Sequence, residues 1–227
     1  MILAMHVSDG LVSIPVSLAF AVMALAGVGF ALYRAKGTLD ERTAPIAGLT
    51  AVFVFAAQML NFPVAAGTSG HLLGGALAAV LVGPYAASLA ITMVLLIQGL
   101  LFADGGLTAL GLNVFNMSVV GVWVGYAAFL LVRRLLPTRT TSVVAAAAVA
   151  AFLSVPSAAA AFVLEYALGG TGTFSINAVL TAMVGTHLLI GIGEALITSF
   201  TISAVLATRA DLVYGWKRPA LSLEVRK

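Results

Sequence analysis

The sequence predicts an all-α integral membrane protein with about seven transmembrane helices. Of its 227 residues, 62% are hydrophobic and 8% are charged, whereas a typical soluble domain is roughly 25% charged. The apolar runs are long and continuous, unlike the alternating segments of about ten residues that build a membrane β-barrel. We therefore interpret residues 1–227 as one helical membrane domain, placed in the lipid bilayer as a multi-pass protein of the cell inner (plasma) membrane.

Seven apolar segments follow one another along the chain. They are predicted at residues 11–33, 44–60, 71–82, 85–102, 110–132, 143–166 and 176–206. Pro45 suits the first turn of the second helix, where its missing N–H has no helical partner in any case. Pro63 ends that helix, because a proline disfavours helical geometry in the residue before it. The short third segment stops at Gly83-Pro84.

The later segments have equally clear limits. The fourth breaks at Asp104-Gly105-Gly106, and the basic pair Arg133-Arg134 ends the fifth. Pro156 lies inside the sixth segment and predicts a kink there. The seventh segment follows a glycine-rich loop and is long enough to tilt or to project beyond the bilayer.

Basic residues predict the orientation. On a seven-span count all eleven Lys and Arg residues fall on one side of the membrane: Arg34, Lys36, Arg42, Arg133, Arg134, Arg139, Arg209, Lys217, Arg218, Arg226 and Lys227. Because basic loops stay in the cytoplasm, we predict the N-terminus outside and residues 208–227 as a cytoplasmic tail. The pI of about 9.5 is then a consequence of topology, and we expect no nucleic-acid partner.

The histidines are predicted on the opposite, outer side. His6 precedes the first segment, His71 opens the third, and His187 lies in the seventh, which begins outside. Asp9 and Asp104 share that side. A face with imidazoles and carboxylates but no fixed positive charge attracts cations.

His6 and His71 are candidate ligands for a divalent metal, because neutral imidazole binds such ions well. If Met5 carried a free amine, that amine, the amide nitrogen of His6 and the His6 imidazole would form a fused chelate. His71 would then supply a fourth nitrogen. Square-planar nitrogen coordination favours Ni²⁺ or Cu²⁺ and can accommodate Co²⁺. The alternative is that both histidines are ordinary interfacial residues, and composition leaves the two interpretations open.

Four motifs resemble those of one known family. Met5-His6-Val7-Ser8-Asp9-Gly10 is similar to the Met-His-Ile-Pro-Asp-Gly opening of the CbiM/NikM family. These proteins are the substrate-binding (S) components of energy-coupling-factor transporters for cobalt and nickel. Residues 61–75, 104–113 and 193–198 resemble three further family patterns. Each motif is weak alone, but the ordered set is specific.

The resemblance implies where the metal binds. Residues 5–10 would tuck into the bundle from outside, and the ligands would be the Met5 amine, the His6 amide and imidazole, and His71. The sequence departs from the family pattern because residues 1–4 precede Met5. An amine on residue 1 could not form the short chelate, so we expect Met5 to be the true start. Removal of residues 1–4, or a different site, are the alternatives.

Further residues are candidates for orienting the ligands or gating the site. They are Asn61, Thr68, Ser69, Gln98, Asn113 and Glu194. We predict that Asn113 and Gln98 orient His71, since ligating imidazoles need a hydrogen-bond partner. An ionisable residue inside a span usually faces a polar interior. Glu194 is thus interpreted as an orienting residue, as part of a metal path, or as an acceptor for loop backbone.

The resemblance implies the substrate-specific membrane component of an ATP-driven Co²⁺ or Ni²⁺ importer. It implies partners: a transmembrane coupling (T) subunit and two cytoplasmic ATPase subunits, with or without a small accessory membrane subunit. No phosphate-binding Gly-x-x-x-x-Gly-Lys-Ser/Thr run occurs, so this chain is not expected to be an enzyme, and the metal is expected as substrate, without a catalytic cofactor.

Two other classes of function are alternatives to this one. A self-contained secondary transporter or channel for divalent metal ions would need ionisable residues strung across the membrane midplane, and only Glu194 and His187 come near it. An intramembrane zinc hydrolase is disfavoured because the chain has no His-Glu-x-x-His run.

Overall fold

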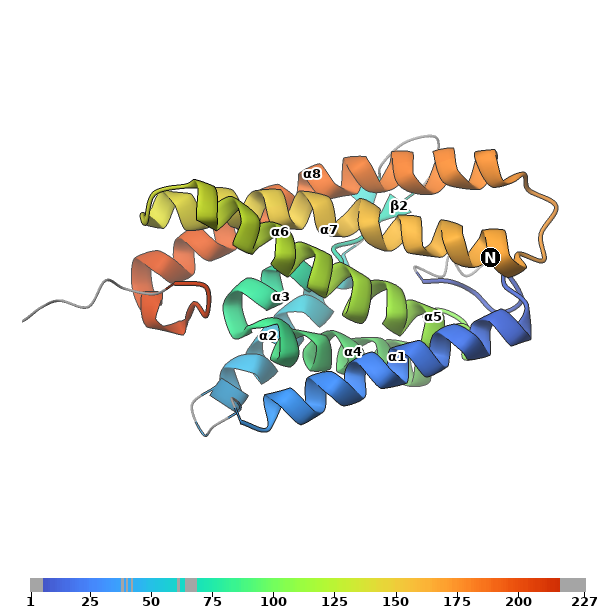
Figure 1. Cartoon of the computed structure of the whole chain (residues 1–227), viewed down its shortest axis with the longest axis horizontal. Helices are drawn as coiled ribbons and strands as arrows, with labels where there is room; N and C mark the ends of the chain where they lie inside the picture. The colour runs from blue at the N-terminus through green and yellow to red at the C-terminus, as the bar shows by residue number, and fades with distance from the viewer. Residues whose placement is uncertain are drawn as a thin grey trace, which may run out of the picture.

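A computed structural model describes residues 6–37, 39, 41, 43–60, 62–63 and 69–216, with the backbone alone at 62–63 and 69–70. Within these residues the long helices run side by side along the longest axis of the molecule (Figure 1). The helices are α1 (Ile14–Ala35), α2 (Thr43–Gln58), α3 (Gly75–Val82), α4 (Pro84–Leu101), α5 (Leu110–Val114), α6 (Val122–Leu135), α7 (Thr140–Gly169) and α8 (Ile176–Arg209).

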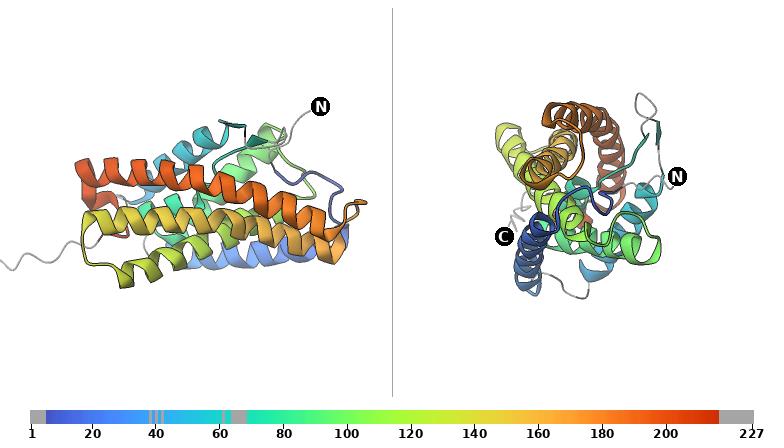
Figure 2. Two further views of the ribbon diagram at one scale, coloured as in Figure 1. Left: turned by 90° about the horizontal axis from the view of Figure 1, so that it is seen from above. Right: turned by 90° about the vertical axis from the view of Figure 1, so that its right-hand side faces the viewer.

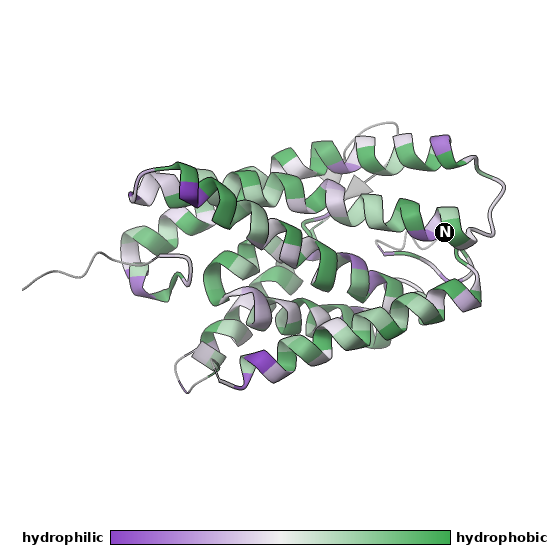
Figure 3. Cartoon of the chain, in the orientation of Figure 1, coloured by the Kyte–Doolittle hydropathy of each residue, from purple (hydrophilic) through white to green (hydrophobic). Residues whose placement is uncertain are grey.

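The predicted membrane class is confirmed. In the described part of the chain, five helical stretches are long and apolar enough to cross a bilayer: α1, α4, residues 110–135, α7 and residues 176–212. Helix α2 is shorter and equally apolar, and α3 completes the seven predicted segments. Hydrophobic residues cover most of the helix lengths in Figure 3, with the most hydrophilic ones near the ends. The number of crossings and the orientation remain predictions.

The third predicted segment is helical over only part of its length. Residues 71–74 are not helical, and α3 begins after Gly74, whose φ of 76° is left-handed. A Cβ at Gly74 would lie 2.8 Å from the side chain of Val54, so both the backbone and the space demand glycine. Residues 75–81 are all buried. Helix α3 is therefore a half-helix inside the bundle, too short to span a membrane at 1.5 Å per residue.

Two irregular stretches lie beside this half-helix. The π-helix Phe115–Gly121 joins α5 to α6 in one continuous rod, and wide π turns of this kind are frequent at functional sites. The strands β1 (Phe62–Pro63) and β2 (Ser69–Gly70) form an antiparallel pair just before His71. Helix α7 runs through Pro156 without interruption, and the kink expected there stays a prediction.

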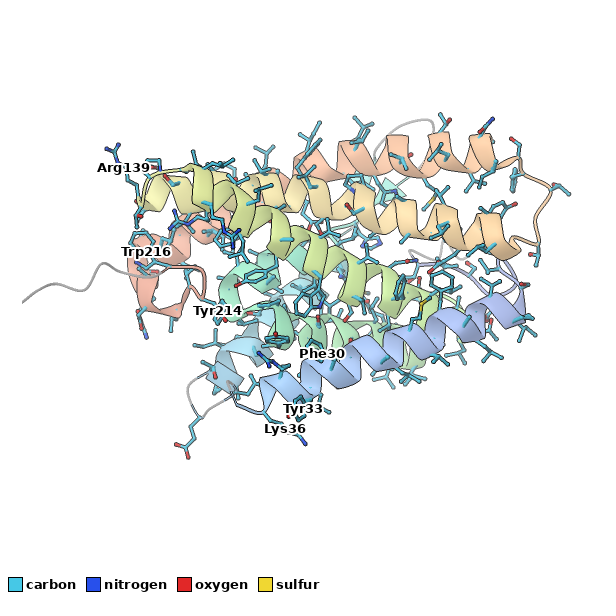
Figure 4. The ribbon with its side chains drawn as sticks, in the orientation of Figure 1. Phe30, Tyr33, Lys36, Arg139, Tyr214 and Trp216 are labelled. Atoms are coloured by element: carbon cyan, nitrogen blue, oxygen red, sulfur yellow. The ribbon has the colours of Figure 1, made fainter. Side chains whose placement is uncertain are left out.

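Basic and aromatic residues gather at one end of the bundle. Figure 4 shows Arg139 and Trp216 at this end, with Lys36 farther along in the same half of the bundle, where α1 ends. Here the chain after the 3-10 turn Ala210–Leu212 folds back under α3, and the N–H groups of Tyr214 and Gly215 donate to carbonyls of the last α3 turn, 3.0 and 3.2 Å away. The segment that precedes α1 lies at the opposite end, where it crosses the end of the bundle (Figure 2, right).

Candidate metal-binding site

The segment that carries His6 is held by the polypeptide that leads into α5. We call residues 6–13 the N-terminal arm. The Val7 N–H donates to Oδ1 of Asn113 at 3.0 Å, and Nδ2 of Asn113 donates to the Val7 carbonyl at 3.3 Å. The Gly106 N–H donates to the same carbonyl at 2.9 Å. The Asn113 amide thus pairs with the Val7 peptide as a neighbouring β-strand would.

The rest of the arm is held by two loops. Oδ1 of Asp9 accepts hydrogen bonds from the Thr108 N–H at 2.8 Å and from the Thr108 hydroxyl. The bond from the hydroxyl, followed by that from the N–H, lowers the pKa of Asp9 below its usual range. Thr171 in the α7–α8 loop donates its N–H to the Leu11 carbonyl at 3.1 Å and its hydroxyl to the Gly10 carbonyl. The arm is therefore tied down along its whole described length.

Two glycines make this close packing possible. Gly105 has a left-handed φ of 89°, and a Cβ there would lie 2.8 Å from Cβ of His6. A Cβ on Gly106 would collide with the backbone nitrogen of Asp9. The glycine pair after Asp104 is thus the surface on which the arm rests.

The segment that carries His71 is held from the interior of the bundle. We call residues 71–74 the His71 arm. Leu73 is fixed at both of its backbone groups: its N–H donates to Oε2 of Glu194 in α8 at 2.8 Å, and its carbonyl accepts from Nε2 of Gln58 in α2 at 2.9 Å. The Gly74 N–H donates to Oε1 of Glu194 at 3.0 Å. Nδ1 of His71 lies 2.9 Å from the Leu72 carbonyl, which ties the ring to its own arm.

The two arms bring His6 and His71 together. Their ring centroids are 5.1 Å apart at a tilt of 58°, and each residue is only 8% exposed. Nδ1 of His6 lies 3.3 Å from Oδ2 of Asp104. Neither ring nitrogen of His6 has a hydrogen-bond partner among the described residues, although burying such a group without one is costly. A cation bound at His6 would satisfy this group.

A cavity of about 530 Å³ lies against the two histidines. It is lined mainly by apolar side chains of α7 and α8, with Asn113 and Asn116 among its few polar groups. His187 also lines it, so all three histidines of the chain border one space. Nδ1 of His187 lies 2.7 Å from the Met183 carbonyl one turn earlier, as expected for a residue whose polar atom is satisfied within its own helix.

Some of the predicted site residues lie outside the described part of the chain. Met5, Asn61 and Thr68 fall outside the described residues, and Ser69 is described only by its backbone in β2. Gln98 is fully buried in α4, and neither atom of its side-chain amide has a hydrogen-bond partner in the described part of the chain. The carbonyl of Gln98 accepts from the Asp104 N–H at 3.1 Å, so this residue shapes the loop beside His6.

The structure assigns Asn113 a different partner from the one predicted. Its hydrogen bonds go to Val7, next to His6, and not to His71. Sequence reasoning did not identify Gln58, although an amide inside the apolar segment 44–60 is a usable signal. It also did not foresee that Asn116, in the π-helix, donates to Oε2 of the fully buried Glu165 at 2.9 Å.

Known proteins are similar to this chain over nearly its whole length. The family described as "Cobalt uptake substrate-specific transmembrane region", CbiM, matches residues 6–212. A putative fused nickel transport protein, NikMN, from Archaeoglobus fulgidus is 38% identical over 209 residues, which are 92% of this chain and 68% of that protein. A cobalt transport protein, CbiM, from Sorangium cellulosum is 35% identical over 216 residues, covering 92% of this chain and 94% of the relative.

A solved structure is also similar to this chain. The crystal structure of a transition metal transporter superposes with a TM-score of 0.81 at 30% identity, covering 89% of this chain and 93% of that one. Because the family match spans nearly the whole bundle, from the N-terminal arm to the end of the last helix, this chain belongs to the CbiM family of substrate-specific transmembrane proteins.

Proposed function

We propose that this chain is the substrate-binding membrane component of an ATP-driven, energy-coupling-factor importer of Co²⁺ or Ni²⁺. The ion is captured where the two arms meet. Its ligands are the amine of Met5, the amide nitrogen and imidazole of His6, and the imidazole of His71. The chain performs no catalysis, and the ion is its substrate.

The observation that carries this proposal is the meeting of His6 and His71. Two buried imidazoles from distant parts of the chain lie 5.1 Å apart between ring centroids, and both ring nitrogens of His6 are without a hydrogen bond from any described residue. The Asp104 carboxylate, 3.3 Å from His6, adds negative potential that favours a cation. Neutral imidazole nitrogen is a ligand that suits nickel and related ions.

Side chains alone do not complete the site. Among the described residues, no group of three or more His, Cys, Asp or Glu side chains could hold a metal ion. The proposed set needs only two such side chains, because the other two nitrogens come from the backbone at Met5 and His6. This is why the identity of the amino-terminal residue matters to the proposal.

The partner proteins follow from the same proposal. Energy would come from two cytoplasmic ATPase subunits acting through a transmembrane coupling subunit, with or without a small accessory membrane subunit. The Archaeoglobus relative supports association with a further transporter component, because it is named a fused transport protein and is longer than the region matched here. The cytoplasmic side would then be the end of the bundle nearer to Lys36 and Arg139 (Figure 4).

The direct test is metal titration of the purified chain, with its amino terminus first identified by mass spectrometry. We expect His6→Ala and His71→Ala each to weaken Ni²⁺ binding by more than the roughly 10–100-fold typical of residues that merely support a ligand. His187→Ala is the matched control, because it removes a third imidazole from the same cavity and should leave the affinity unchanged.

Two results would refute parts of this proposal, and a third would favour its alternative. Unchanged affinity in His71→Ala would refute the proposed site, and a native chain that begins before Met5 and still binds Ni²⁺ tightly would refute the amine ligand. Uptake into vesicles that contain this chain without any ATPase subunit would favour the self-contained transporter instead.

A further inference from the structure

Glu194 is a carboxyl group inside a membrane-spanning helix. It lies in the interior of α8 and is 1% exposed. Ionisable groups at such positions are expensive, and they are kept where they have a function. Glu194 does not line the cavity beside the histidines. Its two oxygens instead accept the N–H groups of Leu73 and Gly74, at 2.8 and 3.0 Å.

These two N–H groups lead directly into α3. Leu73 and Gly74 precede the first helical residue, Gly75, so their N–H groups have no partner within α3, and beside a buried half-helix they cannot reach bulk water. A carboxylate satisfies both donors at once and interacts favourably with the positive end of the helix dipole. Glu194 therefore fixes the point at which the His71 arm becomes α3.

The same contact determines the position of His71. Leu73 is held on its N–H by Glu194 from α8 and on its carbonyl by Gln58 from α2, so its peptide groups are held between two helices. His71 is two residues away, and its Nδ1 lies 2.9 Å from the Leu72 carbonyl of the same arm. The orientation of the imidazole therefore depends on the backbone segment that Glu194 binds.

We propose that Glu194 is a positioning residue, which aims the His71 imidazole at the incoming divalent cation by binding the Leu73 and Gly74 N–H groups and is not itself a ligand. This inference rests on the proposed function, because it presumes that His71 binds the ion. On this proposal, the buried carboxyl group holds one metal ligand in its binding orientation before the ion arrives. Groups that support metal ligands generally have this role.

The test is a double-mutant cycle of Glu194→Gln and His71→Ala, read as Ni²⁺ affinity of the purified full-length chain. A glutamine presents an N–H₂ group to one of the two backbone donors, so one hydrogen bond is replaced by a repulsive contact. We expect Glu194→Gln alone to lower the affinity by about 10–100-fold. In the His71→Ala background the same change should have no further effect, because a residue that acts only through His71 has nothing left to position.

Glu165→Gln is the matched control. It makes the same chemical change at the other fully buried glutamate, which accepts a hydrogen bond from Asn116 and makes none with the described residues of the His71 arm. Its Ni²⁺ affinity should equal that of the unchanged chain. The ligand-field absorption of bound Ni²⁺ gives an independent signal, because Glu194→Gln should shift the band toward that of His71→Ala, whereas Glu165→Gln should not.

Each outcome separates the two proposals. If His71→Ala has no effect, the proposed function fails. If His71→Ala weakens binding but Glu194→Gln does not, or if the two effects simply add, the positioning role alone is overturned. Should Glu194→Gln not fold, Glu194→Asp keeps the carboxylate but withdraws it by one methylene. It should lose affinity by a smaller factor, again only while His71 is present.

Discussion

The two arms that meet at the candidate site are held in different ways. The His71 arm is bound by Gln58 of α2 and Glu194 of α8, whose side chains are buried in the bundle at 0% and 1% exposure. The N-terminal arm is bound mainly by loop groups at the end of the bundle, and its contacts with Thr108 and Thr171 are exposed to solvent. Exposed hydrogen bonds open more readily than buried ones, since local stability follows burial.

This difference suggests a division of labour between the ligands. If His71 binds the ion as proposed, we expect it to be in place before the ion arrives, because the side chains that hold its arm are buried in the interior. In the proposed site the N-terminal arm carries the remaining ligands, and because several of its contacts are exposed, we expect it to be the part that closes over the ion. Such closure by a mobile segment is a common way to admit a ligand and then sequester it.

The strongest test of the comparison is Asn113→Leu. This change removes both hydrogen bonds to Val7 with little change in volume. Two hydrogen bonds contribute about 1–3 kcal/mol in total, which corresponds to a loss of roughly ten- to a hundredfold in Ni²⁺ affinity. Titration of the purified chain measures it. Asn177→Leu, an exposed asparagine at the start of α8, is the control. Equal affinities in the two variants would show that the arm does not depend on Asn113.

A smaller effect is expected for Gly105→Ala. Alanine in the left-handed conformation costs about 1–2 kcal/mol, and its Cβ would lie 2.8 Å from that of His6. We expect the arm to shift and the Ni²⁺ affinity to fall by about tenfold, while the melting temperature changes little because this loop lies outside the core. Gly29→Ala is the control, since a Cβ there meets nothing within 4 Å. A large drop in melting temperature would instead show that Gly105 is needed for the stability of the whole fold.

Only some of this arrangement is accessible from the sequence. The membrane class follows from composition, and His6 and His71 stand out because so few polar residues occur in the apolar chain. The partner of Asn113 could not be deduced, because its contact joins residues 106 apart in sequence and depends on how the arm folds back. The residue type predicted an orienting role but did not say which ligand it orients.

The half-helix illustrates a second limit. Residues 71–82 form a continuous apolar run, and hydropathy alone does not distinguish an extended entry from a helix over 71–74. The structure breaks the run at Gly74 because its φ is left-handed and Val54 occupies the space of a side chain. The glycines at 74 and 75 were the available signal for this break. The role of Glu194 could not be predicted without knowing where this break lies, because the two N–H groups that it binds belong to residues at the break.

The smallest effect is expected at the exposed end of the N-terminal arm, for Asp9→Asn. The hydrogen bonds from Thr108 lower the pKa of Asp9 in the folded chain, so the ionised form is favoured when the arm is docked. This contribution to docking is complete above the usual pKa of about 3.9 and is lost as the pH falls through the lower folded value.

Hydrogen exchange of the arm amides in the metal-free chain measures this contribution, once intrinsic exchange rates are corrected for pH. Protection should hold from neutral pH down to about pH 4 and decline below it, since about 3.9 is the usual pKa of the group. In Asp9→Asn, protection should be slightly weaker at neutral pH and should not decline in that acid range, whereas residues 71–74 should be unaffected in both chains. If the His71 arm lost protection in parallel, the two arms would form one cooperative unit, and the division between a fixed and a closing ligand would be wrong.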